Sequence, residues 1–116
     1  MYSIDIISTG LAIPSRTVTN DDLAQIEETS NEWIEKRTGI KERRFTGEGE
    51  SANVLAIRAA RQALEKSGIS LEKIGLVLVA TLSGDYSTPS VASQMQEALG
   101  LPKDVPYLDV NAACSG

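Results

Sequence analysis

The chain has a single cysteine, Cys114, and this residue is the one best suited to covalent chemistry. It follows a strand-like run and lies among small residues in the sequence LDVNAACSG. The free N–H groups at the start of a helix can stabilise a thiolate placed between a strand and that helix. Free cysteines are also commonly buried and inert. The local pattern therefore leaves two alternatives, a nucleophile or a buried structural thiol, and the second is the more common outcome.

Trp33 and Arg37 are spaced i, i+4, which places them on one face of a helix. A flat indole and a planar cation at this spacing could hold an aromatic base between them. Phosphates could then contact the nearby cations Lys36, Lys41, Arg43 and Arg44. The alternative is that Trp33 packs into the core and the cations are solvated. The segment SGDYSTPS, which contains Thr88, has hydroxyls and one carboxylate, and such a composition is typical of an ordinary loop.

Histidine is absent from the sequence, and this limits the possible mechanisms. Neither a Ser-His-Asp unit nor a Cys-His pair can be completed within the chain, and zinc would have no imidazole ligand. The sequence also lacks a CxxC motif, an HExxH motif and a GxxxxGK[ST] phosphate loop. We therefore expect no metal and no bound cofactor.

Composition narrows the class of protein. A chain of 116 residues forms at most one domain, and its 41% hydrophobic and 23% charged residues are typical of a globular protein. The net charge of −5 argues against broad binding to nucleic acid or to an anionic membrane. No apolar run approaches the roughly 18 residues of a membrane span, and the start lacks the features of a signal peptide. With one cysteine and no internal disulfide, these features predict a cytoplasmic protein.

The pattern of apolar residues, caps and breakers predicts an alternating series of strands and helices. Strands are expected at residues 4–13, 74–82 and 106–113, the second of them covered on both faces. Helices are expected at residues 20–28 with Asn20 as N-cap, at 29–39 with a capping box from Thr29 to Glu32, at 51–67, and from 89–90 to 99–100. Residues 41–50 are expected to form an exposed loop.

This order predicts a mixed α/β layered fold. The helix at 51–67 has one face of small residues that allows close approach to a neighbouring element: Ala52, Leu55, Ala56, Ala59, Ala60 and Ala63. A core strand immediately before the end of the sequence is unusual, and its natural continuation, a helix starting at about Cys114, is expected to be missing from these residues.

Four blocks together resemble a known family over nearly all of the chain: TSNEWIEKRTGIKERR, VLVAT, TPSVASQMQEALGL and LDVNAACSG. They are similar to the N-terminal part of β-ketoacyl-acyl-carrier-protein synthase III. The resemblance implies an α/β, thiolase-like layered fold with a mixed β-sheet flanked by helices, of which residues 1–116 would be the N-terminal half, truncated just after the nucleophile motif. The family's catalytic His and Asn lie in the C-terminal half, so this half would be missing or would come from a separate chain.

The family's activity implies a role for each candidate residue. Cys114 matches the nucleophile, which takes the acyl group of an acyl-CoA, with acetyl-CoA as the expected primer, before condensation with malonyl-acyl-carrier protein. Trp33 and Arg37 match residues that flank the CoA adenine, and Thr29 matches a polar neighbour of that base. Thr88 stands where some members carry a Phe that reaches into the acyl pocket of the partner subunit, so a homodimer is implied. Acyl-CoA would be a substrate and not a cofactor.

Two other interpretations stay open. One is a related acyltransferase of the same superfamily, either a hydroxymethylglutaryl-CoA synthase or a starter-unit synthase of a secondary pathway. The block NEWI followed by RTGI favours synthase III, because it belongs to the CoA entrance of that branch. The other is a non-catalytic half that serves assembly only.

Overall fold

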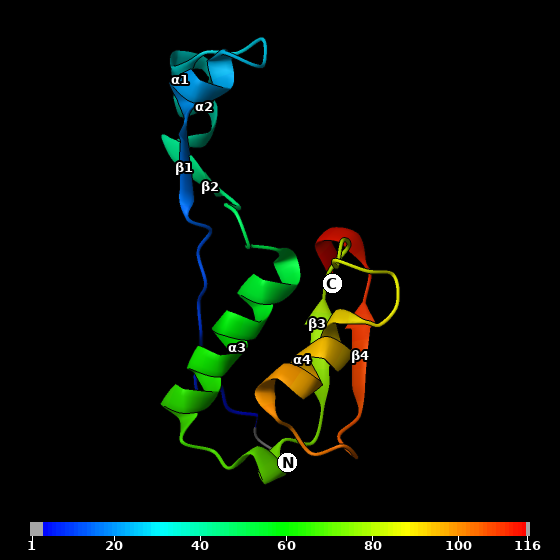
Figure 1. Ribbon diagram of the computed structural model, residues 1–116. Coiled ribbons are helices and arrows are strands. Elements are labelled where there is room, and N and C mark those ends of the chain that lie inside the picture. The colour runs from blue at the N-terminus through cyan, green and yellow to red at the C-terminus, as the bar shows by residue number, and fades with distance from the viewer. Residues whose placement is uncertain (1–3, 116) are drawn as a thin grey trace. The chain divides into compact units, whose positions relative to one another are not determined.

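The structure is a computed structural model that describes residues 4–115. These residues form two compact units, one spanning Ile13–Glu50 and the other made of the remaining described residues. Each unit contains one short two-stranded sheet, antiparallel in the first and parallel in the second (Figure 1). The mixture of helices with both kinds of strand pairing confirms the predicted α/β class.

The unit Ile13–Glu50 is a small antiparallel sheet with two short helices between its strands. Its elements are β1 (Arg16–Thr19), α1 (Asn20–Ala24), α2 (Asn31–Thr38) and β2 (Glu42–Phe45). The register pairs Arg16 with Phe45 and Thr19 with Glu42. The guanidinium of Arg16 lies 5.3 Å from the centre of the Phe45 ring, a cation–π contact across the ladder. Val18 and Ile34 are the buried apolar side chains of this unit.

Two expectations for this part of the chain are wrong. Residues 41–50 are not all loop, because Glu42–Phe45 pairs with β1. The N-cap is also one residue earlier than expected: α1 starts at Asn20 and Thr19 is its N-cap, with a hydroxyl that accepts a hydrogen bond from the backbone N–H of Asp22. The carboxylate of Asp22 accepts in return from the backbone N–H of Thr19, and together with the Thr19 hydroxyl this lowers the pKa of Asp22.

The second unit is built around a strand–helix–strand motif. Its elements are α3 (Ala52–Ser67), a 3-10 turn η1 (Leu71–Lys73), β3 (Val77–Ala80), α4 (Val91–Leu99), β4 (Tyr107–Val110) and a second 3-10 turn η2 (Ala113–Ser115). The parallel strands β3 and β4 lie side by side and α4 packs against both (Figure 1). The core lies between α4 and the sheet and contains Val77, Ala92, Met95, Leu99, Leu101 and Val105.

The two longest helices begin and end where the sequence predicts. Ser51 caps α3 and Ser90 caps α4, each by accepting a hydrogen bond from a backbone N–H in the first turn. Gly68 and Gly100 end these helices with positive φ angles of 64° and 68°, which glycine adopts without a Cβ penalty. None of the helices in residues 4–115 is long and apolar enough to cross a membrane.

The strand expected at residues 4–13 is absent from the described residues. Neither of the two described sheets includes this segment. Its side chains Ile4 and Ile6 are 97% and 87% exposed. Instead it runs along the small-residue face of α3: the Ser8 hydroxyl donates to the carbonyl of Ala63, and a Cβ on Gly10 would overlap the carbonyl oxygen of Ala59. The predicted close approach to α3 is therefore confirmed, although the approaching element is not a strand.

The strand expected at residues 74–82 is shorter and is covered on one face only. It spans Val77–Ala80, with Val77 buried and Leu78 58% exposed. A continuously apolar strand is typical of a sheet that is covered on both faces. Within residues 4–115, however, only α4 and α3 supply such cover, and they lie on the side of Val77.

Candidate functional site

Cys114 lies just beyond the end of β4 and its side chain is exposed. Ala113–Ser115, at the end of the described residues, forms a single 3-10 turn. Ala113 has a φ of 49°, the left-handed conformation that non-glycine residues seldom adopt. This left-handed residue stands immediately before the cysteine. Within the described residues, the Cys114 thiol is therefore accessible.

The segment that leads to Cys114 is tied to the start of α4 by Asp109. One carboxylate oxygen of Asp109 accepts a hydrogen bond from the backbone N–H of Val91 at 2.8 Å, and the other accepts from the N–H of Ala92 at 2.8 Å. Two of the four free N–H groups at the helix N-terminus are satisfied in this way, and the negative charge faces the positive end of the helix dipole. The strand before Cys114 and the helix after Thr88 are therefore held together.

Thr88 lies in the loop between β3 and α4 and is exposed. The peptide bond between Thr88 and Pro89 is cis. Asp85, from the same loop, contacts the start of α3: its carboxylate accepts from the Ser51 hydroxyl, and its backbone N–H donates to the side-chain oxygen of Asn53 at 3.1 Å. The loop that carries Thr88 is thus attached to α3 through Asp85 and to β4 through the first turn of α4.

Trp33 and Arg37 lie together on the outer face of α2. The guanidinium carbon of Arg37 is 4.4 Å from the centre of the Trp33 ring, so the cation stacks directly on the indole. Trp33 is 53% exposed, which contradicts the alternative of a core tryptophan. The two side chains line an open hollow of about 560 Å³ together with Ser30, Glu32 and Lys36.

A base does not fit between Trp33 and Arg37 in this conformation. Atoms in van der Waals contact are about 3.5–4.0 Å apart, so a ring held between two planar groups needs them about 7 Å apart. The observed separation is 4.4 Å. Either Arg37 turns away to admit a base, or the base stacks on the open side of the pair.

The hydroxyl of Thr29 does not face the open hollow. Its oxygen is buried and has no hydrogen-bond partner among the described residues. The predicted capping box from Thr29 to Glu32 is also wrong, because Ser30 is the N-cap and accepts a hydrogen bond from the N–H of Trp33 at 3.2 Å. The expected end of this helix at residue 39 is confirmed, since Gly39 is the C-cap and has a φ of 71°.

The cations around α2 are not equally available to an anionic ligand. Lys36 and Arg37 line the hollow. Lys41 is 3.5 Å from the carboxylate of Glu35, and Arg43 points inward, donating to the carbonyl of Val18 and to the side-chain oxygen of Asn20. Two of the N–H groups of Arg43 are therefore engaged within the unit. Arg44 is exposed on β2.

The structure brings the candidate residues together in two groups, one in each unit. Thr29, Trp33 and Arg37 lie in the unit Ile13–Glu50, and Thr88 and Cys114 lie in the other. Nowhere in residues 4–115 do three potential metal ligands among His, Cys, Asp and Glu come together. The sequence interpretation gave Asn20 only a capping role and gave Asp109 none. For Asp109 a signal existed, since it is the one carboxylate inside the apolar run of β4.

No family model matches the chain, but individual proteins do. The β-ketoacyl-[acyl-carrier-protein] synthase III of Latilactobacillus sakei is 50% identical over 111 residues, which cover 96% of this chain and 33% of that protein. The solved structure of 3-oxoacyl-[acyl-carrier-protein] synthase III from Aquifex aeolicus superposes with a TM-score of 0.88 at 44% identity, covering 95% of this chain and 35% of that one. The priming β-ketosynthase of the R1128 polyketide biosynthetic pathway superposes with a TM-score of 0.86 at 34% identity, covering 96% of this chain and 33% of that one.

The chain spans about a third of the length of the curated relatives it matches. Identity of 44–50% to synthases III extends over almost every residue of the chain, and the backbone follows the same course in the solved structures. The resemblance seen in the sequence is therefore confirmed, and the mixed α/β architecture is a fragment of the thiolase-like fold. The chain is a homologue of β-ketoacyl-[acyl-carrier-protein] synthase III and corresponds to the N-terminal third of that enzyme.

Proposed function

We propose that the chain is the N-terminal part of a condensing enzyme that initiates type II fatty acid synthesis in the cytoplasm. Cys114 is the nucleophile in this proposal, and its position carries the argument. It is exposed at the end of β4, directly after the left-handed residue Ala113, in a homologue of synthases III. An accessible thiol presented by a sharp turn is the arrangement that a nucleophile needs.

The first half-reaction transfers an acyl group. The thiolate of Cys114 attacks the carbonyl carbon of an acyl-CoA, with acetyl-CoA as the expected primer. The carbon–sulfur bond to CoA breaks, CoA leaves as a thiol after taking up a proton, and an acyl-Cys thioester remains. In the second half-reaction, malonyl-acyl-carrier protein loses carbon dioxide and its enolate attacks the acyl-Cys carbonyl. The Cys114 thiolate leaves, and a β-ketoacyl-acyl-carrier protein is released.

The hollow on α2 supports a site for the nucleotide of the acyl-CoA. Trp33 offers an exposed aromatic face, and Lys36 and Arg37 bring positive charge for phosphates. Arg37 must leave its contact with Trp33 if the adenine is to lie between them. Thr29 would contact the base only after its hydroxyl turns out of its buried position. Thr88 belongs, in this proposal, to the loop that shapes the acyl pocket across the homodimer.

Residues beyond this chain must complete the catalyst. The sequence has no histidine, so the His and Asn that stabilise the enolate in the family have to come from the C-terminal half. Large apolar side chains exposed in the second unit support a larger domain, among them Ile4, Ile6, Leu78 and Leu108. We therefore propose that residues 1–116 are one part of a thiolase-fold domain whose remaining part is joined to it or supplied as a separate chain.

The test joins this chain to the C-terminal two thirds of the Aquifex aeolicus enzyme, a protein called the completed synthase below. We expect it to form acetoacetyl-acyl-carrier protein from acetyl-CoA and malonyl-acyl-carrier protein. Cys114→Ala should abolish acylation, which intact-protein mass spectrometry detects as an added acetyl group. A folded completed synthase that is not acylated by any acyl-CoA from two to eight carbons would contradict the proposal.

A starter-unit synthase of a secondary pathway is the second candidate. Thr88 takes the place of a bulky Phe found in some synthases III, and the priming β-ketosynthase of the R1128 pathway shares the backbone at a TM-score of 0.86. A smaller residue leaves room for a longer or branched primer. Primer competition on the completed synthase separates the two: acetyl-CoA preferred tenfold or more favours fatty acid initiation, by the usual size of pocket discrimination, about 10–200-fold.

A further inference from the structure

Asn20 is the most deeply buried polar side chain of the unit Ile13–Glu50, with 1% of its surface exposed. Every hydrogen-bonding group of its carboxamide has a partner. The amide nitrogen donates to the side-chain oxygen of Asn31 at 2.8 Å and to the carbonyl of Ile40 at 2.8 Å. The amide oxygen accepts from the guanidinium of Arg43 at 2.6 Å. Such a network is specific for its members, because removing one hydrogen-bond partner leaves a buried donor or acceptor unpaired.

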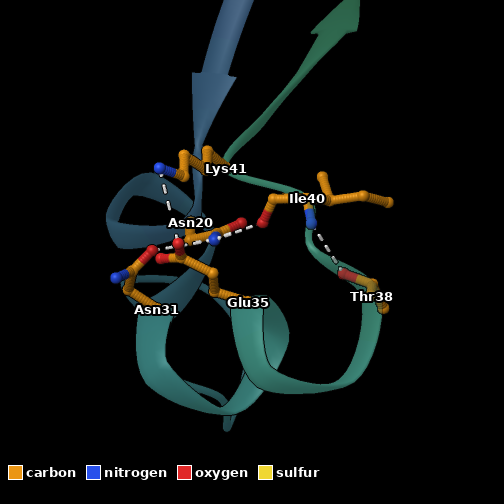
Figure 2. A network of polar contacts seen from close by, with 6 residues as sticks. All are labelled: Asn20, Asn31, Glu35, Thr38, Ile40 and Lys41. Atoms are coloured by element: carbon orange, nitrogen blue, oxygen red, sulfur yellow. Dashed lines mark hydrogen bonds and ion pairs between the residues drawn. The ribbon is translucent and has the colours of Figure 1, made fainter.

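The partners of Asn20 bracket helix α2 at both of its ends. Asn31 is the first residue of α2, and Ile40 follows its C-cap glycine, as Figure 2 shows with Asn20 between them. The exit of the helix is fixed further by Thr38, whose hydroxyl donates to the carbonyl of Ile34 and accepts from the N–H of Ile40. The ion pair between Glu35 and Lys41 joins the middle of α2 to the same exit segment.

One carboxamide therefore holds the two ends of the helix that carries Trp33 and Arg37. Both of those side chains are exposed, and the carboxamide of Asn20 makes its hydrogen bonds to other residues. We propose that Asn20 is a positioning residue for the acyl-CoA nucleotide. It sets the orientation of α2 and therefore the position of the Trp33 ring on which the nucleotide base stacks. This inference rests on the proposed function, because it assumes that the hollow at Trp33 binds the nucleotide.

The chemistry of the network predicts that an amide is required at this position. Aspartate has the shape of asparagine and would still accept from Arg43. It has no N–H to donate, so its second oxygen would face the oxygens of Asn31 and Ile40. An isosteric Asn20→Asp change thus removes the two bonds that bracket α2 and keeps the bond to β2. The change is selective, which a truncation to alanine would not be.

The experiment measures steady-state kinetics of the completed synthase with two acetyl donors. Acetyl-CoA carries the nucleotide, whereas acetyl-S-pantetheine carries the same thioester without it. For Asn20→Asp we expect KM for acetyl-CoA to rise about tenfold, the effect of weakening two hydrogen bonds, while kcat changes little. The kcat/KM for acetyl-S-pantetheine should stay within about twofold of the parent, because the thioester does not touch α2.

Three further variants make the outcome decisive. Gln25→Glu makes the same amide-to-acid change on the exposed C-cap of α1 and should leave both donors unaffected. Asn31→Ala removes one of the two bracketing bonds and should raise KM for acetyl-CoA by a smaller factor, about threefold; it serves as the test if Asn20→Asp does not fold. Trp33→Ala reports on the nucleotide site itself.

The results distinguish this inference from the proposed function. If Trp33→Ala raises KM for acetyl-CoA and both Asn20→Asp and Asn31→Ala leave it unchanged, Asn20 is not a positioning residue and the nucleotide site stands. If kcat/KM falls equally with acetyl-CoA and acetyl-S-pantetheine in the Asn20 and Asn31 variants, the network has only a structural role. If Trp33→Ala has no effect on acetyl-CoA, the hollow is not the nucleotide site and the proposed function fails at that point.

Discussion

The carboxylate of Asp109 on β4 accepts a hydrogen bond from the backbone N–H of Val91, the first residue of α4, at a distance of 2.8 Å. The contact joins two stretches of chain that the proposed mechanism uses together. Cys114 lies five positions after Asp109, and Thr88 lies three positions before Val91. Cys114, the proposed nucleophile, and the loop that carries Thr88 are therefore connected by one side chain within a single unit.

Replacing Asp109 should loosen this connection. Asp109→Ala removes both hydrogen bonds to the first turn of α4, and we expect the free energy of unfolding to fall by about 1–2 kcal/mol, the usual cost of losing a helix cap. Denaturant titration of the completed synthase measures the change. Asp104→Ala is the matched control, because it removes an exposed carboxylate from the turn before β4. Equal stability of the two variants would show that the Asp109 contact contributes nothing.

Gly10 should tolerate no side chain. A Cβ there would overlap the backbone carbonyl of Ala59 on α3, and backbone atoms cannot move aside as a flexible side chain can. We expect Gly10→Ala to lower the melting temperature strongly, with a loss of at least about 2 kcal/mol from overpacking. Gly75→Ala, at a position where a Cβ would meet nothing within 4 Å, should be close to neutral. A parent-like melting temperature for Gly10→Ala would mean that the segment before residue 13 does not lie against α3.

The capping box at the start of α1 should make a small contribution to stability that depends on pH. Hydrogen bonds from the backbone N–H and the hydroxyl of Thr19 lower the pKa of Asp22 below its ordinary value. A lowered pKa in the folded state means that the contribution is complete above the ordinary aspartate value of about 3.9 and is lost as the pH falls through the folded value.

Carboxyl-detected NMR should resolve this titration. The Asp22 signal should titrate at lower pH in the parent protein than in a Thr19→Ala variant, which lacks the hydroxyl that donates to Asp22. Asp22→Asn should remove the acid-induced loss at α1, and Asp21→Asn should preserve it. An Asp22 titration midpoint that is the same in the parent protein and in Thr19→Ala would contradict the capping box.

Thr88 should influence which acyl groups reach Cys114. A Phe at this position narrows the pocket in the proposed dimer, so Thr88→Phe should shift primer preference toward acetyl-CoA by about tenfold relative to a five-carbon acyl-CoA, within the range of hydrophobic pocket discrimination. Ser87→Phe places the same ring one position earlier in the exposed loop and should leave the preference unchanged. Competition between the two acyl-CoA primers on the completed synthase measures the ratio. A ratio unchanged by Thr88→Phe would exclude Thr88 from the pocket.

The ends of α3 and α4 could be predicted from sequence because their signals are local. Ser51 and Ser90 cap the starts, and Gly68 and Gly100 end the helices, so each boundary depends on residues within one turn. The start of α1 shows how such signals can mislead. Thr19 and Asn20 are both good N-cap residues. Thr19 is the N-cap in the structure because it forms a capping box with Asp22, three residues later.

The features that escaped prediction depend on residues far apart in the chain. β2 has the sequence ERRF, which has no apolar alternation, and it becomes a strand because its backbone pairs with β1. The buried amide of Asn20 takes its partners from positions 31, 40 and 43, so nothing next to it in the sequence indicates burial. For the site itself, the resemblance supplied the roles of Cys114 and Trp33, while exposure and the 4.4 Å contact came only from the structure.

Trp33 is the only tryptophan of the chain, and Arg37 already occupies one face of its ring. The intrinsic fluorescence of the chain at tryptophan wavelengths therefore comes from a single indole at the proposed nucleotide site. A ligand that stacks there either displaces the guanidinium or covers the open face of the ring, and in both cases it brings a π-system beside the fluorophore. The protein thus carries its own optical probe, which needs no label and reports on one place only.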